Sequence, residues 1–140
     1  MFENIDIEKS LKTAQTSLLV MILLTIVNVA GLLIGGGLYL PYSAIIPYAI
    51  VFFSETITIE IITISLLFVG FYVGVGVMSQ NKPIWLIGAL VMYTIDTLVL
   101  FFFFFNYGFD IVRILELLFH GWILISLFKG SVAAYKDMIA

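Results

Sequence analysis

One stretch of the chain decides the fold, residues 110–129, DIVRILELLFHGWILISLFK. Its length and apolar character fit a membrane-spanning helix, which needs about 20 such residues. The same stretch also carries the ionisable side chains of Asp110, Arg113, Glu116 and His120. At ~100° per residue, the last three fall within an arc of ~60°, and Asp110 lies just beside it. Because lipid does not solvate charge, we expect this side of the helix to face the protein interior or a wet cavity.

The composition places the whole chain in a membrane. Of its 140 residues, 63% are hydrophobic, 16% are aromatic and only 11% are charged. A water-soluble domain of this size needs far more surface charge. The formal net charge is −3 and there is no basic cluster, so nucleic acid is not an expected partner. The sequence has no cysteine, which excludes disulfides, thiolate metal sites and cysteine nucleophiles.

Hydropathy divides the chain into four predicted spans within a single domain, residues 1–140. A polar lead-in at 1–16 comes first, and its start lacks the basic region of a cleaved signal peptide. Asp6 and Asn4 are its candidate helix caps. Pro83 suits the first turn of the third span. The four predicted spans and the tail that follows them cover residues 17–40, 57–78, 84–106, 110–129 and 130–140.

The segment between the first two spans, residues 41–54, is the least regular part of the sequence. Pro41 and Pro47 interrupt an apolar run that is too short to cross a bilayer. One interpretation is an interfacial elbow, whose tyrosines belong to the aromatic belt at a bilayer surface. A re-entrant hairpin that lines a cavity is the second, and a long start to the second span is the third.

The distribution of basic residues predicts the orientation. With four spans, only Arg113 lies near one side of the membrane, and the other side receives five lysines: Lys9, Lys12, Lys82, Lys129 and Lys136. Basic loops stay in the cytoplasm, so both termini are expected there. The sequence thus predicts an all-α protein of the cell membrane, a bundle of four transmembrane helices, N-in and C-in, with an interfacial or re-entrant elbow between the first two.

Several polar side chains are predicted to meet near the bilayer midplane. At ~1.5 Å per residue, Asn28 and Asp96 lie ~16 Å from the cytoplasmic ends of their helices. His120 lies ~13 Å and Glu116 ~20 Å from that side, and the hydroxyl of Tyr93 reaches the same level. Three interpretations stay open for this cluster: a buried network that fixes helix register, a proton or cation path, or a ligand or metal site. One histidine with two carboxylates resembles a metal triad in residue types only, so neither a metal nor a cofactor is expected.

Two further features concern helix packing. At the outer end of the fourth span, Arg113 is flanked by Asp110 and Glu116 at helical spacing, which predicts local ion pairing. On the second span, the expected inward face holds Glu60, Thr63, Leu67, Gly70 and Gly74.

Two GxxxG pairs, Gly31 with Gly35 and Gly70 with Gly74, predict close helix contacts. In antiparallel spans the two pairs lie in opposite halves of the membrane. Each pair is therefore expected to face another helix, either of this chain or of a second copy. We accordingly expect a homo-oligomer or a membrane-protein partner.

The sequence gives no sign of an enzyme. It lacks HExxH, GxSxG, Walker A and a GxGxxG ahead of a helix. Ser126 lies ~120° around the helix from His120, too far to form a nucleophile and base. The favoured function is that of a small non-enzymatic membrane protein, an accessory or assembly subunit. The alternative is a small oligomeric transporter or channel that moves protons or cations by way of Asp96, Glu116 and His120.

Overall fold

The computed structural model describes residues 6–36, 39–108 and 110–139. Within these residues all regular structure is helical, in the order α1 (Ile7–Leu33), α2 (Ile45–Phe52), α3 (Ile59–Asn81), a 3-10 turn η1 (Pro83–Trp85), α4 (Leu86–Tyr107) and α5 (Ile111–Ile139). Four candidate spans are long and apolar enough to cross a membrane, namely α1, α3, η1 continued by α4, and α5. The predicted all-α architecture with four candidate spans is confirmed.

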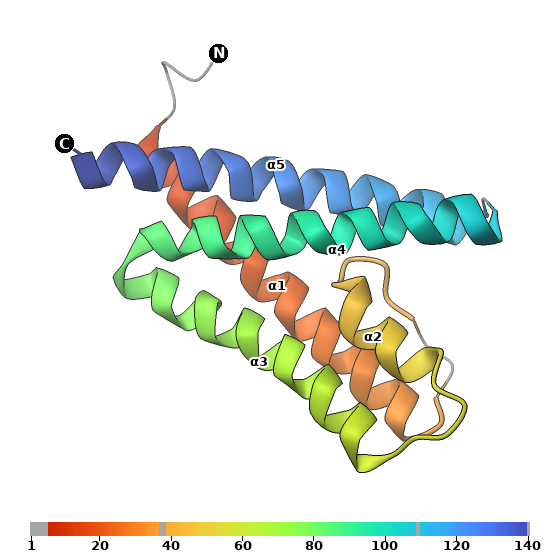
Figure 1. The fold of residues 1–140 in the computed structure, drawn as a ribbon. Helices are drawn as coiled ribbons and strands as arrows, with labels where there is room; N and C mark the ends of the chain where they lie inside the picture. Colours follow the sequence, from red (N-terminus) through yellow and green to blue (C-terminus); the bar gives the residue numbers. More distant parts are fainter. Residues whose placement is uncertain (1–5, 37–38, 109, 140) are drawn as a thin grey trace.

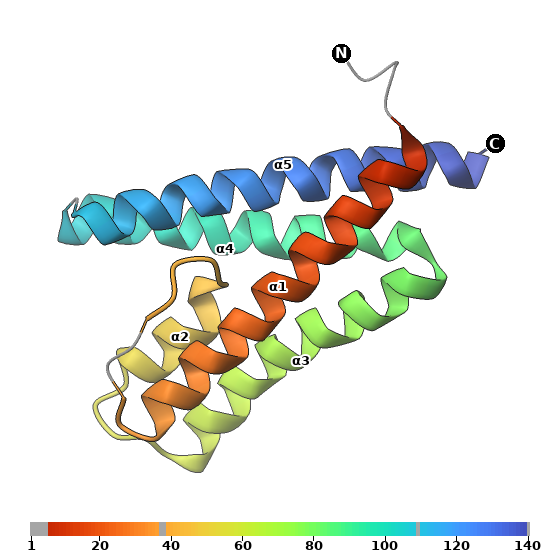
Figure 2. The same cartoon turned by 180° about the vertical axis from the view of Figure 1, so that it is seen from behind.

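The long helices form two obliquely crossed pairs. Helices α4 and α5 run side by side, and α1 passes across them with α3 at its flank (Figures 1 and 2). The short α2 packs against α3, α1 and α4. The start of α1, the end of α5 and the turn between α3 and α4 all lie at one end of the molecule (Figure 1). The ends of α1 and α4 lie toward the opposite end, as an antiparallel arrangement of four spans requires.

Local signals set most helix ends. The Asp6 carboxylate caps α1 by accepting a hydrogen bond of 3.1 Å from the backbone N–H of Lys9. Pro83 occupies the first turn of η1, where its missing N–H costs nothing. Both predicted signals are confirmed, while Asn4 lies outside the described residues. The helix of the fourth span runs beyond residue 129 to Ile139, because the residues that follow include good helix formers such as alanine and lysine.

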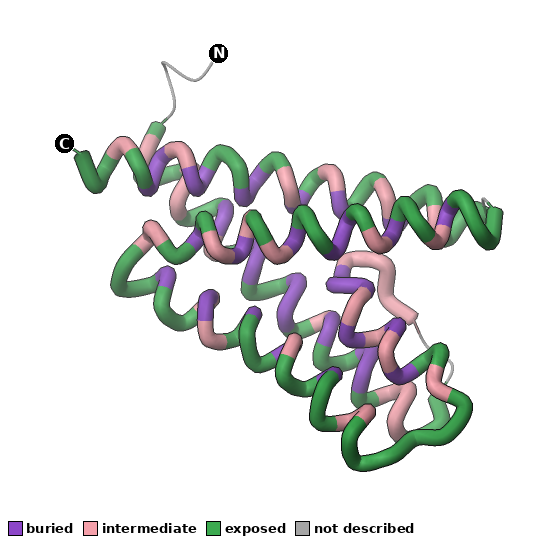
Figure 3. Tube along the Cα trace, in the orientation of Figure 1, coloured by how far each residue is buried: buried purple, intermediate pink, exposed green. Residues whose placement is uncertain are grey.

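Burial separates the inner and outer faces of the helices (Figure 3). The main core lies between α1, α3, α4 and α5 and includes fully buried Leu18, Met21, Tyr93, Ile123 and Leu127. The outward faces carry large apolar side chains, with Leu67 and Trp122 each 67% exposed. A protein surface made of such side chains suits lipid rather than water.

The predicted inward face of the second span is wrong. Glu60, Thr63 and Leu67 are exposed on α3. The residues that α3 buries are instead Ser65, Val69, Tyr72, Val75 and Ser79. Because α3 is apolar all round, its small residues carried no information about which side faces the protein.

Helices α1 and α5 meet at small residues that the GxxxG pattern did not mark. A Cβ added to Gly130 would overlap the Cβ of Ala14, with the backbone oxygen of Ser10 only 3.5 Å away. Ala14 and Ala133 are both fully buried. Gly130 therefore permits a close approach of the two helices.

The four glycines of the GxxxG pairs border open space among the described residues. Apart from the glycine's own chain neighbours and helix backbone, no described atom lies within 4 Å of a Cβ added to Gly31, Gly35, Gly70 or Gly74. Gly35 instead has φ of +84°, a conformation that favours glycine where the chain leaves α1. Packing at these glycines stays a prediction for contacts between copies of the chain.

Candidate functional site

Asp96 holds the start of α2 from a different helix. Its Oδ2 accepts a hydrogen bond of 2.8 Å from the backbone N–H of Ile45, and its Oδ1 accepts one of 2.8 Å from Ile46. The first N–H groups of a helix have no partner within the helix, and Ala44 supplies no side-chain cap for α2. The buried carboxylate on α4 therefore replaces the missing cap, at the end of a helix that favours negative charge.

Asn28 and Thr25 hold the chain just before α2. The Asn28 amide donates to Leu40 O at 2.8 Å and to Ser43 Oγ at 2.7 Å, and its Oδ1 accepts from Leu40 N at 2.8 Å. The Thr25 hydroxyl accepts from Ala44 N at 2.9 Å. Two side chains of α1 thus hydrogen-bond to the backbone of residues 40–44. This satisfies backbone groups that would be costly to leave unpaired in a membrane.

We expect Asn28→Leu to destabilise the protein, because it leaves the N–H of Leu40 without its acceptor and removes one of the two donors to the Leu40 C=O, the other being the Ser43 hydroxyl. The expected loss is about 1–3 kcal/mol in the free energy of unfolding. Thermal unfolding in detergent measures it. The matched control is Asn106→Leu, since the exposed Asn106 amide bonds only to Phe102 O one turn back on its own helix. Equal melting temperatures for the two variants would show that Asn28 does not anchor this segment.

His120 lies beside Asp96 on the neighbouring helix α5. Its Nε2 is 3.8 Å from Asp96 Oδ2, and its Nδ1 is 3.1 Å from the hydroxyl of Thr97. The Tyr93 ring stacks on the imidazole, with centroids 4.6 Å apart and planes at 21°. The Tyr93 hydroxyl donates to Ser43 O at 3.4 Å. The structure therefore brings Asp96, His120 and Tyr93 into one group.

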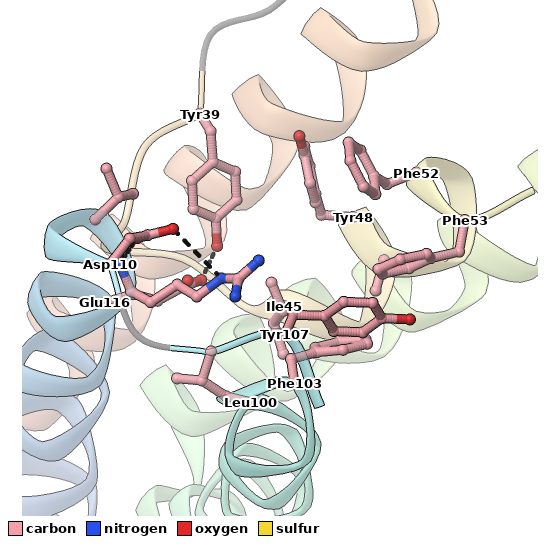
Figure 4. A pocket seen from close by; sticks show the side chains of 13 residues that line it. Tyr39, Ile45, Tyr48, Phe52, Phe53, Leu100, Phe103, Tyr107, Asp110 and Glu116 are labelled. Atoms are coloured by element: carbon pink, nitrogen blue, oxygen red, sulfur yellow. Dashed lines mark hydrogen bonds and ion pairs between the residues drawn. The ribbon is translucent and has the colours of Figure 1, made fainter. Parts of the chain in front are cut away.

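Among the described residues, Asn28 and Glu116 bond to the segment between α1 and α3 rather than to Asp96, His120 or Tyr93. The Tyr39 hydroxyl donates a hydrogen bond to Glu116 Oε1 (Figure 4). Glu116 is 3% exposed, and among the described residues its carboxylate bonds to Tyr39, whereas Asp96 and His120 lie next to each other. The predicted cluster is thus divided, and each part holds a different point of residues 39–46.

A cavity of about 180 Å³ lies beyond Glu116, between α2 and the turn that joins α4 to α5. At its edge Arg113 Nε is 3.7 Å from Asp110 Oδ2, on the residue three positions earlier in the chain. Arg113 also donates to Gly108 O at 2.8 Å. The residues that line the cavity are Tyr39, Ile45, Tyr48, Ala49, Phe52, Phe53, Leu100, Phe103, Tyr107, Asp110, Val112, Arg113 and Glu116.

Sequence reasoning missed several residues that contact the cluster. Tyr39 and Tyr48 are tyrosines of the predicted aromatic belt, yet both line the cavity, and the Tyr39 hydroxyl donates to Glu116. Ser43 had no predicted role, and Thr25 was expected only to face inward on the first span, although Ser43 accepts from Asn28 and Thr25 accepts from Ala44 N. The available signal was the irregular segment itself, because its unpaired backbone in a membrane requires polar partners from the neighbouring helices.

The site shows no arrangement for metal binding: in residues 6–36, 39–108 and 110–139, no three His, Asp or Glu side chains are grouped closely enough to hold an ion. No protein-family model, curated protein or solved structure matches the chain. Fold and site together define a class, that of helical multi-pass membrane proteins.

Proposed function

We propose that the chain is a small non-enzymatic membrane protein that acts as an accessory or assembly subunit, and that its buried polar cluster is structural. One observation carries the proposal. Four side chains from α1 and α4 hydrogen-bond to the backbone of residues 40–46, those of Thr25, Asn28, Tyr93 and Asp96. Such a cluster fixes the position of a segment rather than leaving polar groups free for a substrate.

The same bonds disfavour a proton path through Asp96. Each of its carboxylate oxygens already accepts a backbone N–H, and these donors cannot exchange protons as a relay must. Asn28 uses both its amide nitrogen and its oxygen in the same way. Proton carriers need ionisable groups that reach water or a mobile partner, and neither residue is exposed.

We further propose that residues 39–53 form a re-entrant segment entering from the outer side, with both termini in the cytoplasm. The support is the depth of Asp96, ~16 Å along its span by residue count. Since Ile45 and Ile46 bond to Asp96, α2 would begin near that depth and return toward the surface. The five lysines on one side supply the orientation.

An accessory subunit should exist in a complex. We expect native gels of mildly solubilised membranes from its own cells to show the chain in a discrete assembly with a second membrane protein. Cross-linking before solubilisation, followed by mass spectrometry, identifies the neighbour. A monodisperse single chain in both measurements would contradict the accessory role.

One observation favours the alternative, a proton or cation transporter. Asp96 Oδ2 and His120 Nε2 are 3.8 Å apart, both side chains are fully buried, and this nitrogen has no hydrogen-bond partner among the described residues. Acidic and histidine pairs at membrane depth are the usual parts of relays. The pair therefore needs a direct flux test.

Our expectation is no flux above empty vesicles when the protein is placed in proteoliposomes with a pH-sensitive dye and an imposed potential. His120→Ala removes the unpaired nitrogen, and Asp110→Asn is a matched control at the outer end of α5, outside the buried pair. Wild-type flux that persists in Asp110→Asn and disappears in a folded His120→Ala variant would replace the structural role with transport.

A further inference from the structure

The walls of the cavity are unusually rich in aromatic rings. Tyr48 stacks on Phe52 with centroids 5.6 Å apart and planes at 18°, and Tyr39 lies 4.6 Å from Tyr48. A second group continues from Phe53, whose ring stacks on those of Phe103 and Tyr107 at 5.1 and 5.9 Å. Figure 4 shows these rings around a common space. The face of an aromatic ring is negative, so such walls attract a cation.

The charges that line the cavity leave one acid without a basic partner. Two acids and one base are present, Asp110, Glu116 and Arg113. Arg113 is occupied, because it pairs with Asp110, donates to Gly108 O and lies 5.9 Å from the Tyr107 ring. Glu116 has only the neutral hydroxyl of Tyr39. A buried acid of this kind favours a positively charged ligand.

The dimensions of the cavity limit the ligand to a small one. An apolar protein cavity of roughly 150 Å³ holds a benzene molecule. The present cavity, about 180 Å³, has room for one substituted ammonium group, and a substituent carried by that group can extend through the open rim. Its rim includes Phe52, Phe53 and Tyr107, which are 51–58% exposed, so the space opens to the surroundings.

We propose that this cavity binds a small organic cation, a substituted or quaternary ammonium group, held by the aromatic rings and the Glu116 carboxylate. The same chemistry occurs in a free amine and in the headgroup of a choline lipid. The proposal does not depend on the accessory role, since a subunit of an assembly and a free protein both present this cavity.

The test uses full-length protein in nanodiscs of phosphatidylglycerol, which has no ammonium group, and isothermal titration with benzyltrimethylammonium. We expect saturable binding. The neutral isostere neopentylbenzene has the same shape without the charge and should bind at least about tenfold more weakly. Equal affinity for the two compounds, or no saturation up to about 10 mM, would overturn the proposal.

Variants assign the site. Glu116→Gln keeps an acceptor for the Tyr39 hydroxyl but removes the charge, and it should weaken benzyltrimethylammonium binding at least about tenfold. Asp137→Asn is the matched control, an exposed acid at the far end of α5. If Glu116→Gln does not fold, Tyr48→Leu removes one ring and should weaken binding several-fold. Unchanged affinity in a folded Glu116→Gln variant would exclude this site.

The source of the cation is decided in nanodiscs of phosphatidylcholine. A headgroup that occupies the cavity competes, so the apparent affinity for benzyltrimethylammonium should fall in wild type and stay the same in Glu116→Gln. Unchanged affinity in wild type would assign the site to a free amine. Binding of benzoate in place of the cation would mean that Arg113 governs the cavity, and the proposal would fail.

Discussion

Asp96→Leu is expected to lower the free energy of unfolding by about 4 kcal/mol, because the N–H groups of buried Ile45 and half-buried Ile46 lose the carboxylate that accepts their hydrogen bonds. The leucine side chain has a similarly branched end but cannot accept the bonds from Ile45 and Ile46. Asp96→Asn should fall between leucine and wild type, since its amide offers one oxygen and turns an NH₂ group toward the second N–H. The order wild type, asparagine, leucine is the signature of a cap.

Unfolding in detergent measures this order, and hydrogen exchange locates it. The backbone amides of Ile45 and Ile46 should exchange faster in both variants, while amides in the middle of α4 stay protected. Thr94→Leu is a suitable control, because the exposed Thr94 hydroxyl bonds only to Leu90 O within α4. If Asp96→Leu were as stable as this control, the hydrogen bonds from Asp96 to the start of α2 would not stabilise the protein.

Gly130→Leu is expected to have an effect of similar size at the other end of the molecule. Even a methyl group at this position would overlap the Cβ of Ala14. Overpacking of this kind costs about 1–3 kcal/mol for small additions and more for large ones. Helices α1 and α5 would have to separate along a contact that buries Leu18 and Leu127.

Gly130→Ala and Gly70→Ala make a matched pair for this prediction. Alanine raises helix propensity by about 1 kcal/mol at either position. At Gly70, where a Cβ meets no atom within 4 Å, this gain should appear as stabilisation or leave stability unchanged. At Gly130 the clash should outweigh the gain. Gly70→Ala that dissociates an oligomer without changing the fold would instead show that the GxxxG face joins two copies.

The architecture could be predicted because a membrane-spanning helix needs a long apolar run, which is visible in the local sequence. The lengths of the apolar runs, the cap at Asp6 and the position of Pro83 all depend on neighbours in the sequence. The proximity of Asp96 and His120 could also be predicted, because ionisable residues are rare in membrane spans and each needs a polar partner there.

The partners of the cluster could not be predicted in the same way. Asp96 bonds to residues 50 and 51 positions earlier in the chain. No spacing rule connects them, because backbone N–H groups carry no sequence signal. The same limit explains the wrong face of α3 and the unnoticed role of Gly130. An apolar helix in lipid gains little from either orientation, and one glycine among 11 does not stand out.

The placement of residues 39–46 has a consequence for the order in which the protein is made. A chain emerges from its N-terminus, so Thr25 and Asn28 are already present when this segment is synthesised and can hold residues 40–44 at once. Asp96 arrives two helices later, and Glu116 one helix after that. Helix α2 therefore spends part of its biogenesis with its first amides unsatisfied. Although α2 is made before α3, α4 and α5, its start is among the last parts of the protein to reach the final state. A nascent chain stopped before α4 should therefore expose this segment to chaperones and proteases.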